Sequence, residues 1–160
     1  MATPSKQNTL YLPIKQVYFD QIMAGTKKEE YREIGPNTYK KYLDCDANGN
    51  PWISDIYTED DFEFYGPDLI MACKDGEFPF FMREDILFLN LAVGYNKVRD
   101  TATVEVLDIT AEIGKNAKGQ ELRFDFDKNG KAVLRPDGPF CQWVAVFHLG
   151  KIIEKNIVSK

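Results

Sequence analysis

Four charged side chains from two segments of the chain have the types and spacing to bind a polar ligand or to move protons. Lys27, Glu30 and Arg32 follow one another closely in the run 26–33, and Glu105 stands in a later apolar run. A lysine shielded from water can lose its proton and act as a base or nucleophile, and an arginine matches a phosphate or a base edge. Two nearby carboxylates can share protons or hold the cations in place. We therefore predict a charged cleft, with Lys27, Glu30 and Glu105 as the candidate catalytic set.

The segment that carries the first three of these residues is predicted to be a strand over residues 27–33. Alternation puts Lys28, Glu30 and Arg32 on one face and Glu29, Tyr31 and Glu33 on the other. Neither face is apolar, so the strand is a solvated edge or lines a wet cavity. If it is an edge, its charges serve solubility or an ion-pair network that closes one end of a barrel. A helix over residues 14–24, ended by Gly25, is predicted to precede it.

Glu105 lies in the most regular strand pattern of the chain, residues 101–109. Ala102, Val104 and Val106 share one face, and Thr103, Glu105, Leu107 and Ile109 share the other. Both faces are largely apolar, which predicts burial on both sides. A carboxylate in such a strand needs a partner, because an unpaired charge is costly to bury.

Two further residues are candidates for ligand binding. Tyr95 and Asn96 follow Gly94 in a loop, where the ring could stack on a base or simply cover the end of a barrel. His148 alternates with valines near the end of the chain, and we interpret it as a hydrogen-bonded core residue rather than a general base.

The sequence predicts no metal and no cofactor. Residues 44–55 match a calcium loop in part, but Pro51 stands where a free amide is wanted and the final ligand is the shorter Asp55. A turn-rich surface loop is the alternative that we favour. The three cysteines, Cys45, Cys73 and Cys141, form no CxxC pair and are read as inert buried thiols.

Composition limits the function. The chain has 160 residues, and we expect a single domain over residues 1–160 with an inserted acidic excursion at 44–66. A formal charge of −5 argues against coating of nucleic acid by a broad basic face. The sequence offers neither a membrane-spanning stretch nor a leader, so we expect a reduced, cytoplasmic setting.

Strands dominate the remaining pattern, with helices early, which predicts an α+β fold built on a mixed β-barrel of about five to seven strands. A short helix is expected at 37–43. Further strands are expected at 10–13, 67–73, 85–91 and 140–149, with an Asn-Gly hairpin formed by 122–126 and 132–134.

Several of these segments together resemble ASCH domains. The family's opening helix ends in Gly-x-Lys and runs into a strand bearing Glu-x-Arg, as do Gly25, Lys27, Glu30 and Arg32 here. The segments 94–97, 103–106 and 146–153 resemble the family's Gly-Tyr segment, its Val-Glu-Val strand and the C-terminal strand of phage and bacterial members. Residues 44–66 have no counterpart.

The resemblance implies a PUA-like β-barrel with flanking helices and a cleft for RNA or a nucleobase. Some bacterial members are amidohydrolases that remove the acetyl group of N4-acetylcytidine with a lysine, a threonine and a glutamate, and another has been linked to RNA cleavage. Lys27 and Glu105 match the lysine and the glutamate, whereas Glu30 stands where the threonine is expected.

We therefore predict binding of RNA, a nucleotide or a modified nucleoside by Lys27, Glu30, Arg32, Tyr95, Asn96 and Glu105. The first alternative is an amidohydrolase that acts on an acylated nucleoside, with Lys27 and Glu105 in acid–base roles. The second is a protein-interaction module that meets its partner through the acidic residues 55–63.

Overall fold

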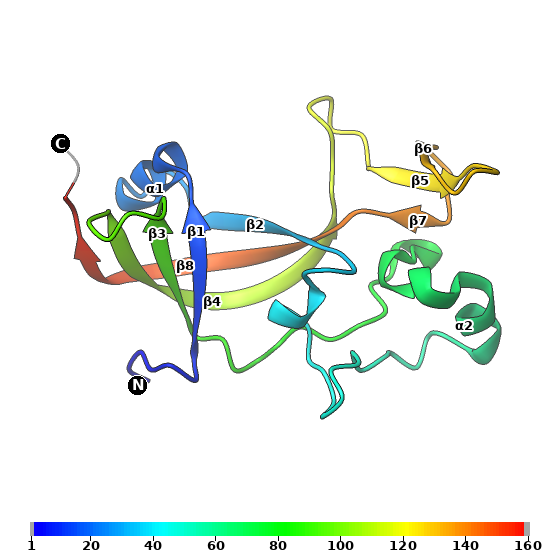
Figure 1. Cartoon of the computed structure of the whole chain (residues 1–160), viewed down its shortest axis with the longest axis horizontal. Helices are drawn as coiled ribbons and strands as arrows, with labels where there is room; N and C mark the ends of the chain where they lie inside the picture. The colour runs from blue at the N-terminus through cyan, green and yellow to red at the C-terminus, as the bar shows by residue number, and fades with distance from the viewer. Residues whose placement is uncertain (1, 159–160) are drawn as a thin grey trace. The chain divides into compact units, whose positions relative to one another are not determined.

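The computed structural model describes residues 2–158 and has the α+β composition that the sequence predicts (Figure 1). Its described strands are β1 (Thr9–Ile14), β2 (Glu29–Ile34), β3 (Phe88–Val93), β4 (Thr101–Ile113), β5 (Arg123–Phe126), β6 (Ala132–Leu134), β7 (Phe140–Cys141) and β8 (Trp143–Asn156). The helices are α1 (Gln16–Met23) and α2 (Glu59–Tyr65), with three 3-10 turns, η1 (Tyr39–Lys41), η2 (Gly66–Met71) and η3 (Lys74–Gly76). The strands form two sheets, ordered β1-β3-β4-β8-β2 and β6-β5-β7, and no closed barrel is found among the described residues.

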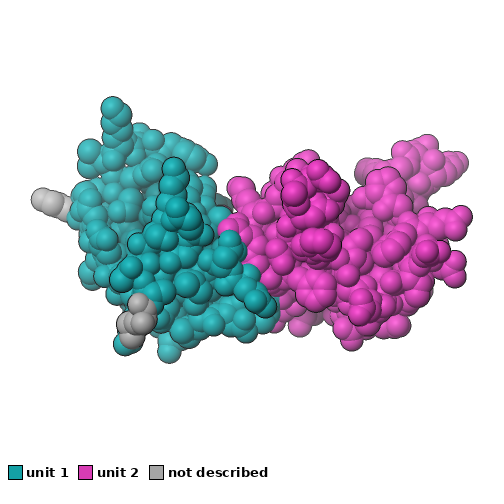
Figure 2. Space-filling view, turned by 90° about the horizontal axis from the view of Figure 1, so that it is seen from below, with its two compact units in different colours: residues 1–30, 84–110, 146–160 teal, residues 31–83, 111–145 magenta. Residues whose placement is uncertain are grey.

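The chain divides into two compact units, which Figure 2 colours separately. The first comprises residues 1–30, 84–110 and 146–160, and the second comprises residues 31–83 and 111–145. The excursion at 44–66 lies wholly within the second unit. That residues 1–160 fold as one domain stays a prediction.

The first unit buries leucines from adjacent strands. β1 runs parallel to β3, which is antiparallel to β4, and this register sets Leu12 opposite Leu91 and Leu89 opposite Val104. All four side chains are at most 1% exposed. Helix α1, which also contacts β3, buries Phe19 and Ile22, and the chain leaves it through Gly25 at φ +78°. Glycine adopts this left-handed conformation without strain.

Strand β4 is not buried on both faces, so that prediction was wrong. Ala102, Val104 and Val106 are buried as expected, but Leu107 is 65% exposed and Asp108 is exposed as well. Burial then resumes at Ile109, one position out of phase, as an extra residue in the strand would produce. The second face of β4 is therefore partly open: Leu107 on it is exposed, and Glu105 is only half-buried.

The second unit has an aromatic core. Tyr57, Tyr65, Ala72 and Phe140 are buried together, with Phe124 and Phe126 of β5 against them. The predicted hairpin is confirmed as β5 and β6, paired antiparallel across a turn at Gly130, which has φ +77°. The predicted strand at 67–73 is wrong. The 3-10 turn η2 covers most of that segment instead, with Pro67 in its first turn, where the ring fixes φ near the helical value.

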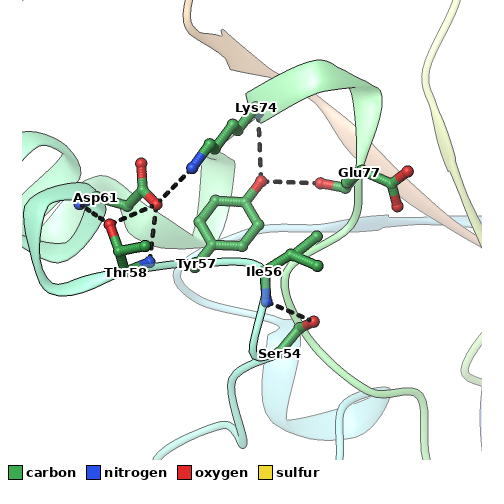
Figure 3. Close-up of polar contacts among 7 residues, drawn as sticks. All are labelled: Ser54, Ile56, Tyr57, Thr58, Asp61, Lys74 and Glu77. Atoms are coloured by element: carbon green, nitrogen blue, oxygen red, sulfur yellow. Dashed lines mark hydrogen bonds and ion pairs between the residues drawn. The ribbon is translucent and has the colours of Figure 1, made fainter.

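Tyr57, just before α2, ties the start of that helix to the chain around η3 (Figure 3). The Tyr57 hydroxyl donates to the Glu77 carbonyl at 2.9 Å and accepts from the Lys74 backbone N–H at 3.2 Å. The Lys74 ammonium reaches the Asp61 carboxylate at 2.8 Å. Asp61 and Thr58 form a capping box, so this cluster fixes both the start of α2 and the chain around η3.

Candidate functional site

Lys27 and Glu30 come together at the turn between α1 and β2. The backbone N–H groups of Thr26 and Lys27 both donate to the Gln21 carbonyl, at 3.0 and 3.1 Å, which fixes the chain as it leaves the helix. The Lys27 ammonium lies 3.6 Å from the Glu30 carboxylate, and the two side chains are only 16% and 7% exposed. The predicted proximity of these two residues is therefore present. The Glu30 carboxylate can therefore keep the Lys27 ammonium in a defined position, because both side chains are largely buried.

An aromatic ring that the sequence did not single out stands beside this lysine. The Lys27 ammonium lies 5.3 Å from the centre of the Tyr18 ring, within the range of a cation–π interaction. Tyr18 is 43% exposed although its neighbour Phe19 is almost fully buried. Helical spacing groups Tyr18 with the apolar positions 14, 17 and 22, so no sequence signal pointed to an exposed ring here.

Glu105 reaches β8 from the neighbouring strand β4. Its carboxylate accepts a hydrogen bond from the Lys151 backbone N–H at 3.4 Å. A Cβ at Gly150 would meet this carboxylate, so a larger residue there would require the Glu105 side chain to move. The Leu149 N–H donates to the Lys28 carbonyl at 2.9 Å, on the β2 side of the same stretch. Glu105 and the turn that carries Lys27 therefore contact residues of β8 that are two positions apart, Lys151 and Leu149.

The remaining predicted ligand-binding residues lie in other elements of the fold. Tyr95 and Asn96 lie in the loop between β3 and β4 of the first unit, and Tyr95 is 86% exposed. Arg32 is a half-buried residue of β2 that belongs to the second unit. The structure therefore places five of the six predicted ligand-binding residues in the first unit.

His148 is hydrogen-bonded, as predicted, but it is not a core residue. Its side chain is 35% exposed. The ring nitrogen Nε2 lies 2.8 Å from the Thr110 hydroxyl, and Nδ1 lies 3.4 Å from the Glu29 carboxylate. Sequence reasoning missed this group because its members come from three strands that are far apart along the chain.

Two of the cysteines form a pair that the sequence reading also missed. Cys73 and Cys141 are buried in the second unit, at 2% and 0% exposure, where the Cys73 N–H donates to the Pro139 carbonyl at 3.0 Å. A hydrogen bond with the Cys141 thiol lowers the pKa of Cys73 to about 7, and the same contact, followed by burial, raises the pKa of Cys141. These thiols are therefore not independent.

The second unit contains a cavity of about 800 Å³. Residues of five segments line it, among them Tyr31, Glu33, Lys115, Glu121, Gln142 and Trp143. None of the predicted site residues lies in this lining.

Other features bear on metals and membranes. The Asp46 carboxylate accepts backbone N–H groups of Asn48 and Asn50 at 2.8 and 3.0 Å, which is the geometry of a polar turn. Within residues 2–158 no three His, Cys, Asp or Glu side chains are grouped so that they could hold a metal ion. None of the helices described is long and apolar enough to span a bilayer.

Comparisons of the chain with protein-family models, curated proteins and solved structures gave no match.

Proposed function

We propose that the first unit binds a nucleobase-containing ligand, namely RNA, a nucleotide or a modified nucleoside, through Lys27 and its neighbours. The observation that carries this proposal is the position of the Lys27 ammonium, 3.6 Å from the Glu30 carboxylate and 5.3 Å from the Tyr18 ring centre. A fixed cation beside a half-exposed ring offers the two contacts that single nucleotides use, a charge for phosphate or a base acceptor and a face for stacking.

Each residue has a distinct role in this proposal. Lys27 contacts the phosphate or a carbonyl of the base, and Tyr18 stacks on the base. Glu30 holds the lysine, and the half-buried Glu105 accepts from an exocyclic amine. Tyr95 offers a second exposed ring. These five residues all belong to the first unit.

The resemblance of residues 12–32 and 94–106 to ASCH domains is the second support. It leads us to propose that the chain is an ASCH-type protein related to PUA-like barrels. The amidohydrolase activity of some ASCH members is the enzymatic form of the same proposal, with Lys27 and Glu105 in acid–base roles. The carboxylate of Glu30 stands in place of their threonine, so we favour ligand binding over amide hydrolysis as the function.

The test measures binding of N4-acetylcytidine, cytidine monophosphate and a short single-stranded RNA by calorimetry, with chromatography to follow cytidine release. Lys27→Met and Tyr18→Ala should each weaken binding by roughly tenfold or more, the effect of losing about 1.4 kcal/mol. Lys28→Ala is the matched control, because this adjacent lysine is exposed.

The outcomes separate the three functions. Binding that weakens in the two variants but not in the control supports the proposal, and cytidine release lost in Lys27→Met and Glu105→Gln would make the protein a hydrolase. If the wild type binds none of the three ligands, the proposal is wrong and the interaction module with residues 55–63 is the function to examine.

A further inference from the structure

A hydroxyl, an imidazole and a carboxylate form a continuous chain across three adjacent strands of the first unit. Thr110 is in β4, His148 is in β8 and Glu29 opens β2, and the sheet order β4-β8-β2 places the histidine on the middle strand. The Thr110 Oγ1 to His148 Nε2 distance is 2.8 Å, and the His148 Nδ1 to Glu29 Oε2 distance is 3.4 Å. A nucleophile next to a base that is oriented by a third group has this order of contacts.

The chemistry of the two contacts assigns the proton positions in the neutral imidazole. A carboxylate only accepts, so the ring proton belongs on Nδ1, facing Glu29. Nε2 then carries a lone pair and accepts the Thr110 hydroxyl proton. The opposite tautomer would set the Nδ1 lone pair against the Glu29 carboxylate. The favoured tautomer is the one in which a histidine can remove a proton from an alcohol.

The group is accessible, unlike a hydrogen-bond chain that serves only to join buried strands. The side chains of His148 and Glu29 are 35% and 42% exposed, and Thr110 is half-buried. The phase change at Leu107 and Asp108 leaves Thr110 on the partly open side of β4, because its neighbour Ile109 is the residue that turns to the core. The approach of a small carbonyl compound is therefore from this partly open side.

We propose that Thr110, His148 and Glu29 form an acyl-transfer site for small activated esters or amides. His148 Nε2 takes the Thr110 proton as Oγ1 forms a bond to the carbonyl carbon, and the same proton passes to the leaving group as its bond to that carbon breaks. In the second half, water attacks the acyl-threonine while Nε2 takes its proton, and Oγ1 leaves with that proton restored. The net reaction is hydrolysis of one acyl bond by one water, and the imidazole is unchanged.

Glu29 is a positioning residue in this site, since it acts through the imidazole. Its carboxylate fixes the tautomer and stabilises the imidazolium that forms during each step. The site uses none of Lys27, Glu30 and Tyr18, so this proposal can be tested independently of the proposed nucleotide site.

The test incubates the full chain with p-nitrophenyl acetate and follows both nitrophenolate release and acetyl groups on the protein by peptide mass mapping. We expect an initial burst and an acetyl ester at Thr110. Thr110→Val should abolish that ester, and Thr110→Ser, which restores a hydroxyl, should recover it. Thr103→Val is the matched control on the same strand and should leave the burst unchanged.

Two further variants separate chemistry from structure. His148→Gln should slow acylation by roughly a hundredfold, because it removes the base from a chain that has one histidine. Glu29→Gln should slow it by at least roughly tenfold while the burst amplitude stays that of the wild type. Melting curves should show each variant folded.

The proposal is overturned if no acetyl ester maps to Thr110, or if folded Thr110→Val or His148→Gln acylates at the wild-type rate. Thr110→Val should bind nucleosides as the wild type does, so failure of this proposal is distinguishable from failure of the nucleotide site.

Discussion

The carboxylate of Asp100 accepts a hydrogen bond from the backbone N–H of Val158 at 2.7 Å. Asp100 is 2% exposed, and its second oxygen accepts from the Gln16 amide at 2.9 Å. A buried carboxylate at the start of β4 therefore connects the first turn of α1 with the segment that follows β8. These elements all belong to the first unit, and the Asp100 side chain contacts both of them.

We expect Asp100→Ala to lower the free energy of unfolding by about 3 kcal/mol, because it removes a buried, charged acceptor from the Gln16 amide and the Val158 N–H. Urea denaturation measures the change. Asp20→Ala is the matched control, since Asp20 accepts from the same Gln16 amide at 2.9 Å but is exposed. We expect that control to lose under about 1 kcal/mol. Equal losses in the two variants would show that Asp100 does not anchor these segments.

The Lys27–Glu30 pair should affect stability as well as binding. Lys27→Met removes a cation from a carboxylate that is 7% exposed, and we expect a loss of about 2 kcal/mol. Adding Glu30→Gln should restore part of this loss, because the buried charge is then gone as well. Chemical denaturation of the wild type, both single variants and the double variant yields the coupling energy. A coupling near zero would mean that the pair makes no net contribution.

Local spacing was enough to predict several elements of the fold. The helix that ends before Gly25, the charged strand after it and the Asn-Gly hairpin depend on contacts between near neighbours, so the pattern of residue types carries them. The proximity of Lys27 and Glu30 also followed, because three positions separate them. In the segment 67–73, by contrast, apolar composition suggested a strand, whereas the backbone restriction of Pro67 produced a 3-10 turn.

Contacts between distant segments were not accessible in the same way. Thr110 and Glu29 meet His148 only because β8 lies between β4 and β2, and no spacing in the chain encodes that order. Exposure of Leu107 depends on a phase change within β4, which strict alternation hides. These long-range relationships formed the site that sequence reasoning passed over.

Removing the Tyr57 hydroxyl should destabilise the protein and change its response to alkaline pH. Tyr57→Phe loses bonds to the Glu77 carbonyl and the Lys74 N–H, which should cost about 1 to 2 kcal/mol. Burial raises the pKa of Tyr57 to about 12 from 10.0, so the neutral phenol stabilises the fold fully below pH 10. That contribution is lost as the pH rises from 10 to 12.

Denaturation at several pH values tests this expectation. The difference in stability between wild type and Tyr57→Phe should be constant below pH 10 and should narrow between pH 10 and 12. Tyr95→Phe is the control, because Tyr95 is 86% exposed and its replacement should leave the pH profile unchanged. A gap between wild type and Tyr57→Phe that stays constant through pH 12 would contradict the assignment.

The paired thiols of Cys73 and Cys141 should form a disulfide when the protein is treated with oxidised glutathione. The Cys73 thiolate, whose pKa is lowered to about 7, attacks glutathione disulfide and releases one glutathione, and Cys141 then displaces the second. The protein loses two hydrogen atoms, and two glutathione molecules leave. Since both thiols are buried, we expect oxidation to be slow in the native protein and faster in mild denaturant.

Intact mass and non-reducing peptide maps measure the product. Cys73→Ser and Cys141→Ser should each prevent it, whereas Cys45→Ser, which changes the half-buried third cysteine, should not. A disulfide that includes Cys45 in the wild type would show that the observed pairing does not direct the reaction.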